Sequence, residues 1–313
     1  MTPARERLPL LAVVVSYESA DVLAECLEAL GRELPRKAVV VVDNASSDGS
    51  AELARAAGVG VVVHASNEGF ACGVNAGVRS AAADAYLLLN PDVTLLPGAL
   101  AALQRCLTET GAAAVGPNLL DGDGQQSNDG YYLRLPSLGQ VLLFYTSLRK
   151  LTKYFPALRR RYQRHEGLRG TRAVDQVPGG CMLVTAEAFE QIGVFDEDYL
   201  IWYEDVDWCE RARRQGRSLM FCGEAQVRHL GGASFTKVAT VEKELLGTLS
   251  LMRFLRLHRP AVARTYAYAL RLDRWLRYRL RGDELQGEFL RRWRTQDIRL
   301  PQAALPVVGD GRR

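Results

Sequence analysis

Short apolar runs alternate with amphipathic stretches along the first 120 residues of the chain. Five runs are rich in valine, leucine and alanine, at 10–16, 38–42, 59–64, 85–89 and 112–116. Continuous β-branched runs are typical of strands covered on both faces of a parallel sheet. Residues with helical spacing lie between them, at 20–30, 52–57, 70–83 and 96–110. This alternation predicts βαβ units and an α/β domain with a mostly parallel central sheet.

The pattern weakens between residues 121 and 170 and then returns. In the weak stretch, tyrosine and phenylalanine lie among many arginines, which indicates a basic insertion. It is either a solvated connection or a flexible or membrane-facing loop. Beyond it we expect further elements: a strand at 181–185, a helix at 186–192, a helix from about 204 to 216 and a strand at 219–222. We therefore expect one catalytic-type domain over residues 1–240, with an insertion at about 121–170.

The C-terminal part, residues 241–313, is helical in composition and basic. It carries 16 Lys and Arg against 8 Asp and Glu, whereas residues 1–240 carry 24 against 28. This asymmetry suggests a negatively charged partner such as nucleic acid, an anionic membrane surface or an acidic lipid. The segment 261–280 is too charged to cross a bilayer. It is either an amphipathic helix lying on a membrane or a helix packed on the body with its arginines outward.

Composition and missing motifs narrow the class of protein. The chain has 313 residues, of which 48% are hydrophobic and 24% charged, as in ordinary globular proteins. Its six cysteines form no C-x-x-C pair and fit reduced thiols. The chain opens without a basic-then-apolar leader, so we expect a cytoplasmic protein. The absence of G-x-G-x-x-G, of a P-loop and of G-x-S-x-G argues against dinucleotide binding, P-loop nucleotide hydrolysis and a serine-hydrolase elbow.

Acidic residues cluster where such a sheet binds ligands. Asp43 and Asp92 follow predicted strands, and ligands of open α/β sheets lie outside the carboxyl ends of the strands. Glu204, Asp205 and Asp207 fall on the first turn of a predicted helix. Taken singly, each of these acids also suits a turn or a helix N-terminus. Together they predict a common site.

Seven short motifs follow one another in an order that is specific as a set. They are 15–17 (VSY), 42–49 (VDNASSDG), 67–77 (NEGFACGVNAG), 90–92 (NPD), 179–180 (GG), 202–207 (WYEDVD) and 229–232 (HLGG). With them the chain resembles family 2 glycosyltransferases of the GT-A fold, a Rossmann-like α/β fold with helices on both faces of the sheet. Within that family it is most similar to rhamnosyltransferase-like members that build bacterial cell-wall or O-antigen glycans. The resemblance covers about residues 9–240.

The resemblance implies roles for the acidic residues. Asp205 matches the general base of inverting members, and Glu204 beside it is a second catalytic candidate. Asp92 matches the metal-binding acid of a DxD-type motif whose first acid is replaced here by Asn90. His229 matches a histidine that completes the metal site in some relatives. Mg²⁺ or Mn²⁺ suits such an oxygen-rich site.

The resemblance also implies binding residues on both sides of the reacting bond. Those for the nucleotide-sugar are Ser16, Tyr17, Asp43, Asn44, Asn75 and Asp92. Asp43 would accept from the ring N–H of a pyrimidine base, and glycines near Asn75 would permit close backbone approach to the nucleotide. Those for the acceptor are Gly179, Gly180, Trp202 and Asp207. Arg211, four residues after Asp207, is its candidate structural partner.

These features predict an inverting, metal-dependent glycosyltransferase. The expected donor is dTDP-rhamnose, and the expected acceptor is a cell-envelope glycan or a lipid-linked glycan at the inner face of the membrane. A UDP-sugar-dependent transferase of the same family and a non-catalytic nucleotide-sugar-binding relative are the alternatives. A nucleic-acid-binding protein is a third, which the acidic body and the lack of a recognition motif disfavour. We expect a cytoplasmic, peripheral enzyme with no nucleic-acid partner.

Overall fold

In a computed structural model of the chain, the first strands and helices alternate as expected. The structure describes residues 7–126, 138–148, 150, 154–155, 168–199, 201–229 and 240–295. The elements up to residue 120 are β1 (Leu11–Ser16), α1 (Ala20–Glu33), η1 (Arg36–Ala38), β2 (Val39–Asp43), α2 (Ser50–Ala56), β3 (Gly60–Val63), α3 (Phe70–Ser80), β4 (Ala85–Leu89), β5 (Val93–Leu95), α4 (Ala99–Thr110) and β6 (Ala114–Leu120). The predicted strands and helices are all present here. Helix α1 continues through Gly31, where we expected it to end.

The later elements complete the sheet and add a second, helical layer. They are α5 (Leu138–Tyr145), β7 (Thr171–Ala173), β8 (Cys181–Thr185), α7 (Ala186–Ile192), α8 (Glu204–Arg214), β9 (Leu219–His229), α9 (Thr240–His258), α10 (Pro260–Arg281) and α11 (Glu284–Thr295). The short strands β5 and β7 were not predicted. Strand β9 is longer than the expected 219–222 and carries His229 at its end. Much of the basic insertion at 121–170 lies outside the described residues.

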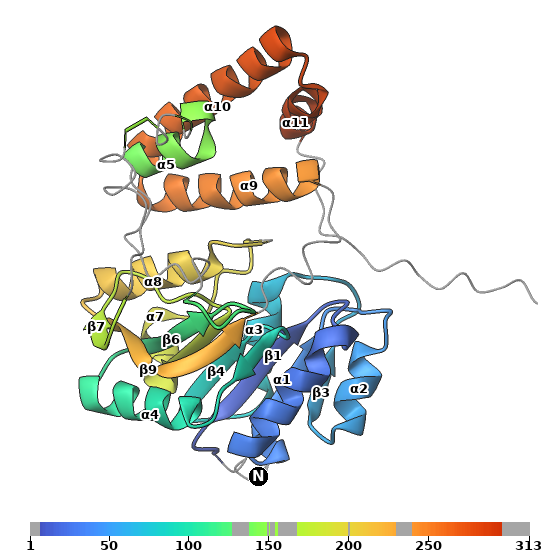
Figure 1. The fold of residues 1–313 in the computed structure, drawn as a ribbon, viewed down its shortest axis with the longest axis vertical. Helices are drawn as coiled ribbons and strands as arrows, with labels where there is room; N and C mark the ends of the chain where they lie inside the picture. The colour runs from blue at the N-terminus through green and yellow to red at the C-terminus, as the bar shows by residue number, and fades with distance from the viewer. Residues whose placement is uncertain are drawn as a thin grey trace, which may run out of the picture.

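The sheet is parallel at one end and mixed at the other (Figure 1). Its strand order is β3-β2-β1-β4-β8-β6-β9-β5, with β7 paired to β9. Strands β3, β2, β1 and β4 are parallel, as expected. Strand β8 is antiparallel to both β4 and β6, and β5 and β7 are antiparallel to β9. The predicted α/β class is therefore confirmed, while the sheet is mixed beyond β4.

Successive residues of β1 pack in two separate cores, because the side chains of a strand point alternately to the two faces of the sheet. Ala12 and Val14 pack in the core that contains buried residues of α1 and α4. Val13 and Val15 pack in the core that contains buried residues of α3, α7 and α8. Helices thus cover both faces of the sheet, and its strands are apolar throughout for that reason.

Two glycines let α3 lie directly on β1. A Cβ atom added to Gly73 would lie 2.6 Å from Cγ1 of Val15, and one added to Gly77 would meet Cγ1 of Val13 even more closely. We expected glycines of this segment to admit a nucleotide. At these two positions they instead admit the side chains of the neighbouring strand.

The C-terminal helices form a layer of their own above the carboxyl ends of the strands (Figure 1). A third core joins α9, α10, α11 and Val141 of α5 to Tyr199, Tyr203 and Val206. Helix α10 turns Tyr266 and Leu270 into this core. Arg274 is also buried, where it binds Glu244 and Gln286, so one of its arginines points inward rather than outward. No described helix is long and apolar enough to cross a membrane.

Candidate active site

Ser16 and Asp43 form one end of the candidate site. They are partners in the register of β1 and β2 and are the last residues of their strands. Both are fully buried, and Asp43 Oδ2 accepts a hydrogen bond of 2.9 Å from the Ser46 N–H. Ser16 Oγ and Asp43 Oδ1 have no hydrogen-bond partner among the described residues. Buried polar atoms are rarely left unpaired, which makes these two oxygens candidates for contact with a polar ligand.

The other residues predicted at the nucleotide are placed differently. Asn44 donates from Nδ2 to the Gly69 carbonyl, and its Oδ1 lies 2.9 Å from Nδ1 of His64. The Asn75 amide donates to the Phe195 carbonyl and to Glu197, and accepts from the Phe195 N–H. Both amides are therefore engaged inside the fold, and their nucleotide roles stay predictions that this geometry does not favour. Tyr17, next to Ser16 in the chain, is half-buried, and its nucleotide role stays a prediction.

Asp92 and His229 meet at the ends of two strands that are distant in sequence. Asp92 follows β4, and His229 ends β9, where it pairs in register with Val93. His229 Nε2 lies 3.3 Å from Asp92 Oδ1, close enough for an ion pair. The two groups are not aligned as a hydrogen bond, and neither ring nitrogen has a hydrogen-bond partner in the described part of the chain. A carboxylate and an imidazole placed in this way leave donor atoms for a third group.

These two side chains fit a divalent cation. The carboxylate oxygen and imidazole nitrogen are ligand types that Mg²⁺ and Mn²⁺ accept, and the unpaired His229 nitrogens provide the free donor. Within the described residues there is no cluster of three or more His, Cys, Asp or Glu side chains able to hold a metal. Because Asn90 replaces the other acid, a cation here would take its remaining ligands from water and substrate.

The Gly179-Gly180 turn joins this pair to the acidic helix. The Gly179 N–H donates to Asp205 Oδ2 at 2.7 Å. A Cβ atom at Gly180 would lie 3.2 Å from the Asn90 amide and 3.7 Å from Cε1 of His229. The turn therefore packs against His229, one of the two predicted metal residues, and against the predicted base. We predicted acceptor contacts for both glycines, and the structure adds a positioning role for Gly179.

The backbone that leads into α8 is strained. Trp202 and Tyr203 have φ angles of 56° and 73°, a left-handed region that non-glycine residues rarely enter. Such strain costs on the order of 1–2 kcal/mol per residue and is found at functional sites. Tyr203 is held in the C-terminal core, 5.8 Å from the Phe254 ring. Trp202 packs against Gly247, where an added Cβ would lie 2.8 Å from its ring.

Glu204 and Asp205 follow this strained turn as the first two residues of α8. Burial, reinforced by the neighbouring Asp205, raises the pKa of Glu204 to about 8. Glu204 Oε2 is buried without a hydrogen-bond partner in the described structure. Burial also raises the pKa of Asp205, although the N–H groups of Gly179 and Val206 stabilise its charged form. A carboxylate with a raised pKa is a better proton acceptor near neutral pH.

Asp207 lies on the other side of α8 and is occupied by protein groups. Its Oδ1 lies 2.6 Å from Nε2 of His258, and its Oδ2 accepts from Arg211 Nε at 2.7 Å. Burial alone would raise its pKa, but the hydrogen bonds from His258 and Arg211 lower the pKa of Asp207. The expected pairing with Arg211 is confirmed. The acceptor role of Asp207 stays a prediction that this geometry does not favour, because both carboxylate oxygens already have cationic or polar partners.

Helix α9 clamps the segment before α8, which the sequence did not suggest. Arg253 binds Asp196 and Asp198 at 2.7 and 2.6 Å. Ser250 Oγ donates to the Ile201 carbonyl at 2.5 Å. These residues and His258 were missed because a scattered Ser, Arg and His in a basic helix carry no local signal. Only the folded chain brings them to residues 196–207.

Known proteins are similar to this chain in sequence and in fold. The model of glycosyl transferase family 2 matches residues 11–193. An N-acetylglucosaminyl-diphospho-decaprenol L-rhamnosyltransferase of Mycobacterium tuberculosis is 29% identical over 69% of this chain and 74% of its own length. The low-salt glycan biosynthesis hexosyltransferase Agl10 of Haloferax volcanii is 24% identical over 69% of this chain and 66% of its own length.

The fold is also that of a solved glycosyltransferase. The mannosyltransferase PcManGT from Pyrobaculum calidifontis, in complex with GDP-Man and Mn²⁺, superposes with a TM-score of 0.55. It is 16% identical, and the match covers 95% of this chain and 79% of that one. At this identity the superposition supports the fold, while the family model covers more than half of the chain. The chain therefore belongs to glycosyl transferase family 2, with the GT-A fold.

Proposed function

We propose that this family 2 glycosyltransferase is an inverting, divalent-metal-dependent enzyme. It transfers a sugar from a nucleotide donor to a hydroxyl of a cell-envelope glycan or lipid-linked acceptor. The observation that carries the proposal is the contact chain around the Gly179-Gly180 turn. That turn holds Asp205 by a 2.7 Å hydrogen bond and packs against Asn90 and His229, beside Asp92. The residues that we assign to the base and to the cation thus lie on two sides of one turn.

Asp205 is the residue we assign to proton transfer. The acceptor oxygen forms a bond to C1 of the sugar as the bond from C1 to the diphosphate oxygen breaks, and the acceptor proton passes to the Asp205 carboxylate. Attack on the face opposite the leaving group inverts C1 in a single step. The Gly179 N–H holds one Asp205 oxygen at a fixed place, and burial raises its pKa. Both features suit a base that acts late, as the hydroxyl becomes acidic.

Asp92 and His229 are the residues we assign to the cation. A Mg²⁺ or Mn²⁺ ion bound there would neutralise charge on the departing diphosphate. Ser16 and Asp43 are assigned to the nucleoside, because Asp43 Oδ1 and Ser16 Oγ are buried acceptors without partners among the described residues. A carboxylate at this place suits the ring N–H of thymine or uracil. Glu204, next to Asp205, either keeps its own proton, because its pKa is raised, or orients the acceptor hydroxyl.

The donor and acceptor are proposed from the relatives. The M. tuberculosis relative is by name an N-acetylglucosaminyl-diphospho-decaprenol L-rhamnosyltransferase, which supports rhamnose as the transferred sugar and a lipid-linked acceptor here. We propose dTDP-rhamnose as the donor. An acceptor of this kind places the enzyme at the inner face of the cell membrane as a peripheral protein. A UDP-sugar donor is the alternative within the same site, since thymine and uracil present the same N–H.

A non-catalytic nucleotide-sugar-binding relative is the alternative from another class. The amide of Asn90, which stands in place of the first acid of a DxD-type motif, favours it. The preserved arrangement of Glu204 and Asp205, with Asp205 bonded to Gly179, argues against it. The two are separated by turnover: a binding protein would retain its nucleotide affinity and give no product with any donor.

The test is a transfer assay that follows product and stereochemistry. Purified protein is incubated with Mn²⁺, with dTDP-rhamnose or a UDP-hexose, and with a polyprenyl-diphosphate-linked N-acetylglucosamine. We expect a product whose new linkage has the anomeric configuration opposite to that of the donor, as read by NMR. Asp205→Asn should lower kcat about 10²–10⁴-fold while nucleotide binding is kept. Asp21→Asn, at an exposed acid of α1, is the matched control. A retained configuration, or full activity of Asp205→Asn, would overturn the assignment.

A further inference from the structure

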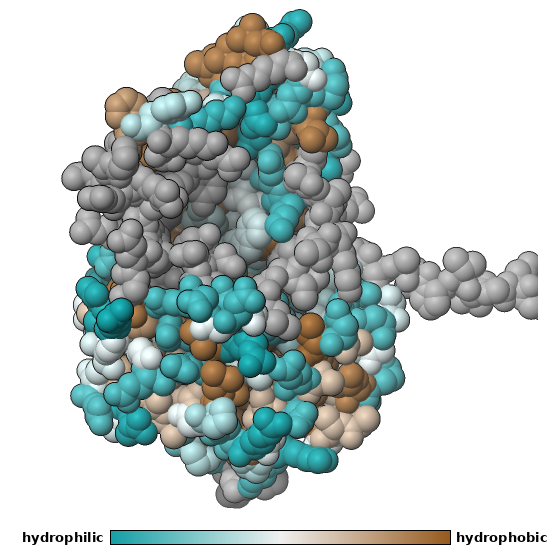
Figure 2. Space-filling model, in the orientation of Figure 1, coloured by the Kyte–Doolittle hydropathy of each residue, from teal (hydrophilic) through white to brown (hydrophobic). Residues whose placement is uncertain are grey.

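Helix α10 has two apolar faces: one is buried in the C-terminal core, and the other is exposed in the described part of the chain. Ala263, Tyr266 and Leu270 are buried in the C-terminal core. A second stripe, on the opposite side, is exposed and consists of Tyr268, Leu272, Trp275, Leu276 and Leu280. These positions recur at spacings of three and four residues, so they lie along one side of the helix. Figure 2 shows hydrophobic side chains gathered at the end of the molecule where α10 lies.

The exposed stripe is large for a protein surface. Tyr268 is 75% exposed, Leu272 57%, Trp275 48% and Leu280 76%. Leu285, at the start of α11, is a further exposed apolar side chain at 53%. Single exposed apolar residues are ordinary, whereas a contiguous row marks an interaction site. We call the five α10 residues the outer stripe.

Arginines accompany the outer stripe, and acids are nearly absent from this helix. Helix α10 contains six arginines and one acid, Asp273. Asp273 is half-buried and accepts a hydrogen bond from the Ser147 N–H. Arg264 and Arg279 are exposed on the same side as the stripe. Positions 264, 268, 272, 275 and 279 follow one another at spacings of three and four residues, so the two arginines and three stripe residues form one row along the helix. Within the described residues neither arginine has an acidic partner at ion-pair distance.

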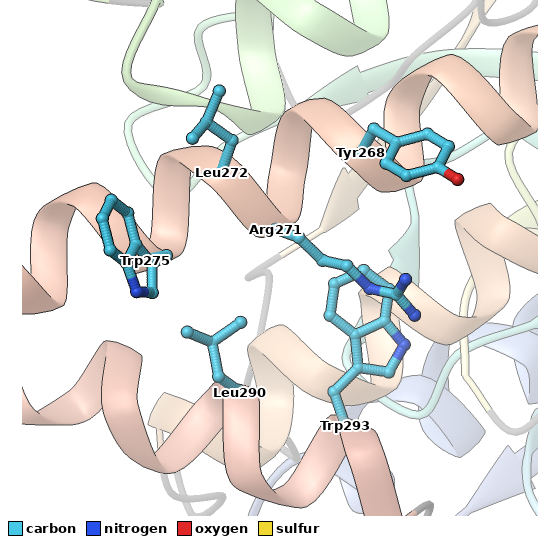
Figure 3. Close-up of a pocket in the computed structure, with 6 residues that line it drawn as sticks. All are labelled: Tyr268, Arg271, Leu272, Trp275, Leu290 and Trp293. Carbon is cyan, nitrogen blue, oxygen red and sulfur yellow. The ribbon is translucent and has the colours of Figure 1, made fainter.

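A groove between α10 and α11 adds aromatic and basic groups to this face (Figure 3). Its volume is about 520 Å³, and it is lined by Tyr268, Arg271, Leu272, Trp275, Leu290 and Trp293. The Arg271 guanidinium lies over the Trp293 ring, 5.1 Å from its centre. Tryptophan and tyrosine are enriched at membrane–water interfaces, where an apolar ring meets a polar headgroup.

We infer that the outer stripe and its arginines form a docking surface for an anionic lipid bilayer. The apolar side chains would enter the boundary between headgroups and acyl chains, and Arg264, Arg271 and Arg279 would meet lipid phosphates. The choice of a bilayer over another protein follows from the charge: this face pairs aromatic and aliphatic side chains with arginines alone. The inference rests on the proposed function where it expects a membrane-anchored acceptor. Binding to lipid is measured without any sugar donor.

The docking surface is joined directly to the candidate active site. Helix α10 begins at Pro260, one residue after Arg259, which binds Glu210 of α8 at 2.8 Å. The residue before that, His258, binds Asp207 of α8. A bilayer that holds α10 would therefore hold, through two polar contacts, the helix that carries Glu204 and Asp205. This places the site at a fixed orientation to the membrane that contains the acceptor.

The experiment is co-sedimentation of the full chain with sucrose-loaded vesicles. We compare vesicles of phosphatidylcholine alone with vesicles that contain phosphatidylglycerol at three parts in ten, at low salt and in about 0.5 M NaCl. We expect binding to the anionic vesicles that is at least tenfold stronger than to the neutral ones, and that weakens in high salt because exposed charges are screened.

Two double variants, each with a matched control, test whether the outer stripe and its arginines bind lipid, apart from general effects of surface hydrophobicity and net charge. Leu272→Ser/Trp275→Ser should lower the vesicle partition coefficient at least tenfold, whereas Val63→Ser, at an exposed valine of the distant edge strand β3, should not. Arg264→Glu/Arg279→Glu should also lower it at least tenfold. Arg55→Glu/Arg105→Glu changes net charge equally at exposed arginines of α2 and α4 and should keep most of the binding. Circular dichroism and melting curves check that each variant is folded.

Several outcomes would overturn the inference. The inference fails if folded wild-type protein does not bind anionic vesicles. It also fails if the stripe variants bind these vesicles as strongly as the wild type does. A wild-type dimer that becomes a monomer in Leu272→Ser/Trp275→Ser would assign the stripe to a second copy of the chain. Nucleotide binding, measured on the same preparation, shows whether the proposed function stands when lipid binding fails.

Discussion

His258 Nε2 lies 2.6 Å from Asp207 Oδ1, so the last residue of α9 is bonded to the helix that carries the candidate base. Both side chains are buried, at 7% and 3% exposure. The neighbouring pair of Arg259 and Glu210 reinforces the contact. The C-terminal layer is therefore a structural support of the site, and changes within it should reach the chemistry.

Loss of the imidazole should weaken this support. In His258→Ala we expect a loss of roughly 1–3 kcal/mol in the free energy of unfolding, because Asp207 stays buried with one partner fewer. We also expect a lower kcat with nearly unchanged donor affinity, since α8 moves while the nucleotide end of the site does not. Arg256→Ala, at an exposed residue of the same last turn, is the control. Equal stability and activity of His258→Ala and the wild type would contradict the support role.

The pH dependence of stability should reveal Glu204. Its pKa is raised from 4.5 in a free side chain to about 8, so the native state binds a proton that the unfolded state has lost. The contribution of Glu204 to the stability of the protein is thus fully present below about pH 4.5 and is lost as pH rises toward 8. Glu204→Gln removes this titration. We expect its Tm to exceed that of the wild type by roughly several degrees at pH 8.5, with the difference shrinking toward pH 5. A difference that does not change with pH would refute the raised pKa.

Asp207 should act in the opposite direction. Its pKa is lowered from 3.8, so its contribution to stability is present at neutral pH and is lost as pH falls below its unfolded pKa. Asp207→Asn should therefore lower the free energy of unfolding at pH 7 and lower it less at pH 3. Urea unfolding at the two pH values measures this, with Asp123→Asn, at an exposed turn acid, as the control. An equal loss at both values would show that the charge of Asp207 is not what stabilises α8.

The two glycines of α3 that face β1 should be intolerant of a methyl group. Gly77→Ala places a Cβ against Val13, and overpacking of this kind costs about 1–3 kcal/mol. Gly31→Ala is the matched control, because Gly31 lies inside α1 with no atom within 4 Å of an added Cβ. There the same change should stabilise by roughly 0.5–1 kcal/mol. Denaturant unfolding of both variants gives the comparison, and equal effects of the two substitutions would contradict the close packing of α3 on β1.

The strand ends were predictable because they depend on local pattern. Asp43 and Asp92 follow apolar runs, and parallel strands bring their carboxyl ends to one edge of the sheet. Glu204 and Asp205 were predictable from their place at a helix start. The position of each acid at a strand end or a helix start follows from ten to fifteen residues around it, whereas the prediction of a common site needed all of the acids together.

Long-range contacts were not predictable in the same way. The side chains of Asn44 and Asn75 look like binding groups until the fold shows that His64, Gly69, Phe195 and Glu197 occupy them. The antiparallel direction of β8 is set by its pairing with both β4 and β6, which local pattern does not encode. His258 meets Asp207 across 51 residues, and a lone histidine carries no sign of such a partner.

The cation site makes a separate prediction about ligand binding. If Asp92 and His229 hold the ion, Asp92→Asn and His229→Ala should each remove the part of nucleotide binding that depends on Mn²⁺. The part that depends on Asp43 should remain. Calorimetric titration of dTDP with and without Mn²⁺ separates the two. Affinity that responds to Mn²⁺ equally in both variants and in the wild type would exclude this pair as the ligands.

The most direct test of the central claim is thermal stabilisation by nucleoside diphosphates. Purified protein is melted with dTDP, UDP or GDP at millimolar concentration, each with Mn²⁺ or with EDTA. A ligand that binds the folded state alone raises Tm by mass action. The account predicts a Mn²⁺-dependent rise with dTDP or UDP, little rise with GDP, and a reduced rise in Asp43→Asn. No rise with any of the three would contradict a pyrimidine nucleotide site at the ends of β1, β2 and β4.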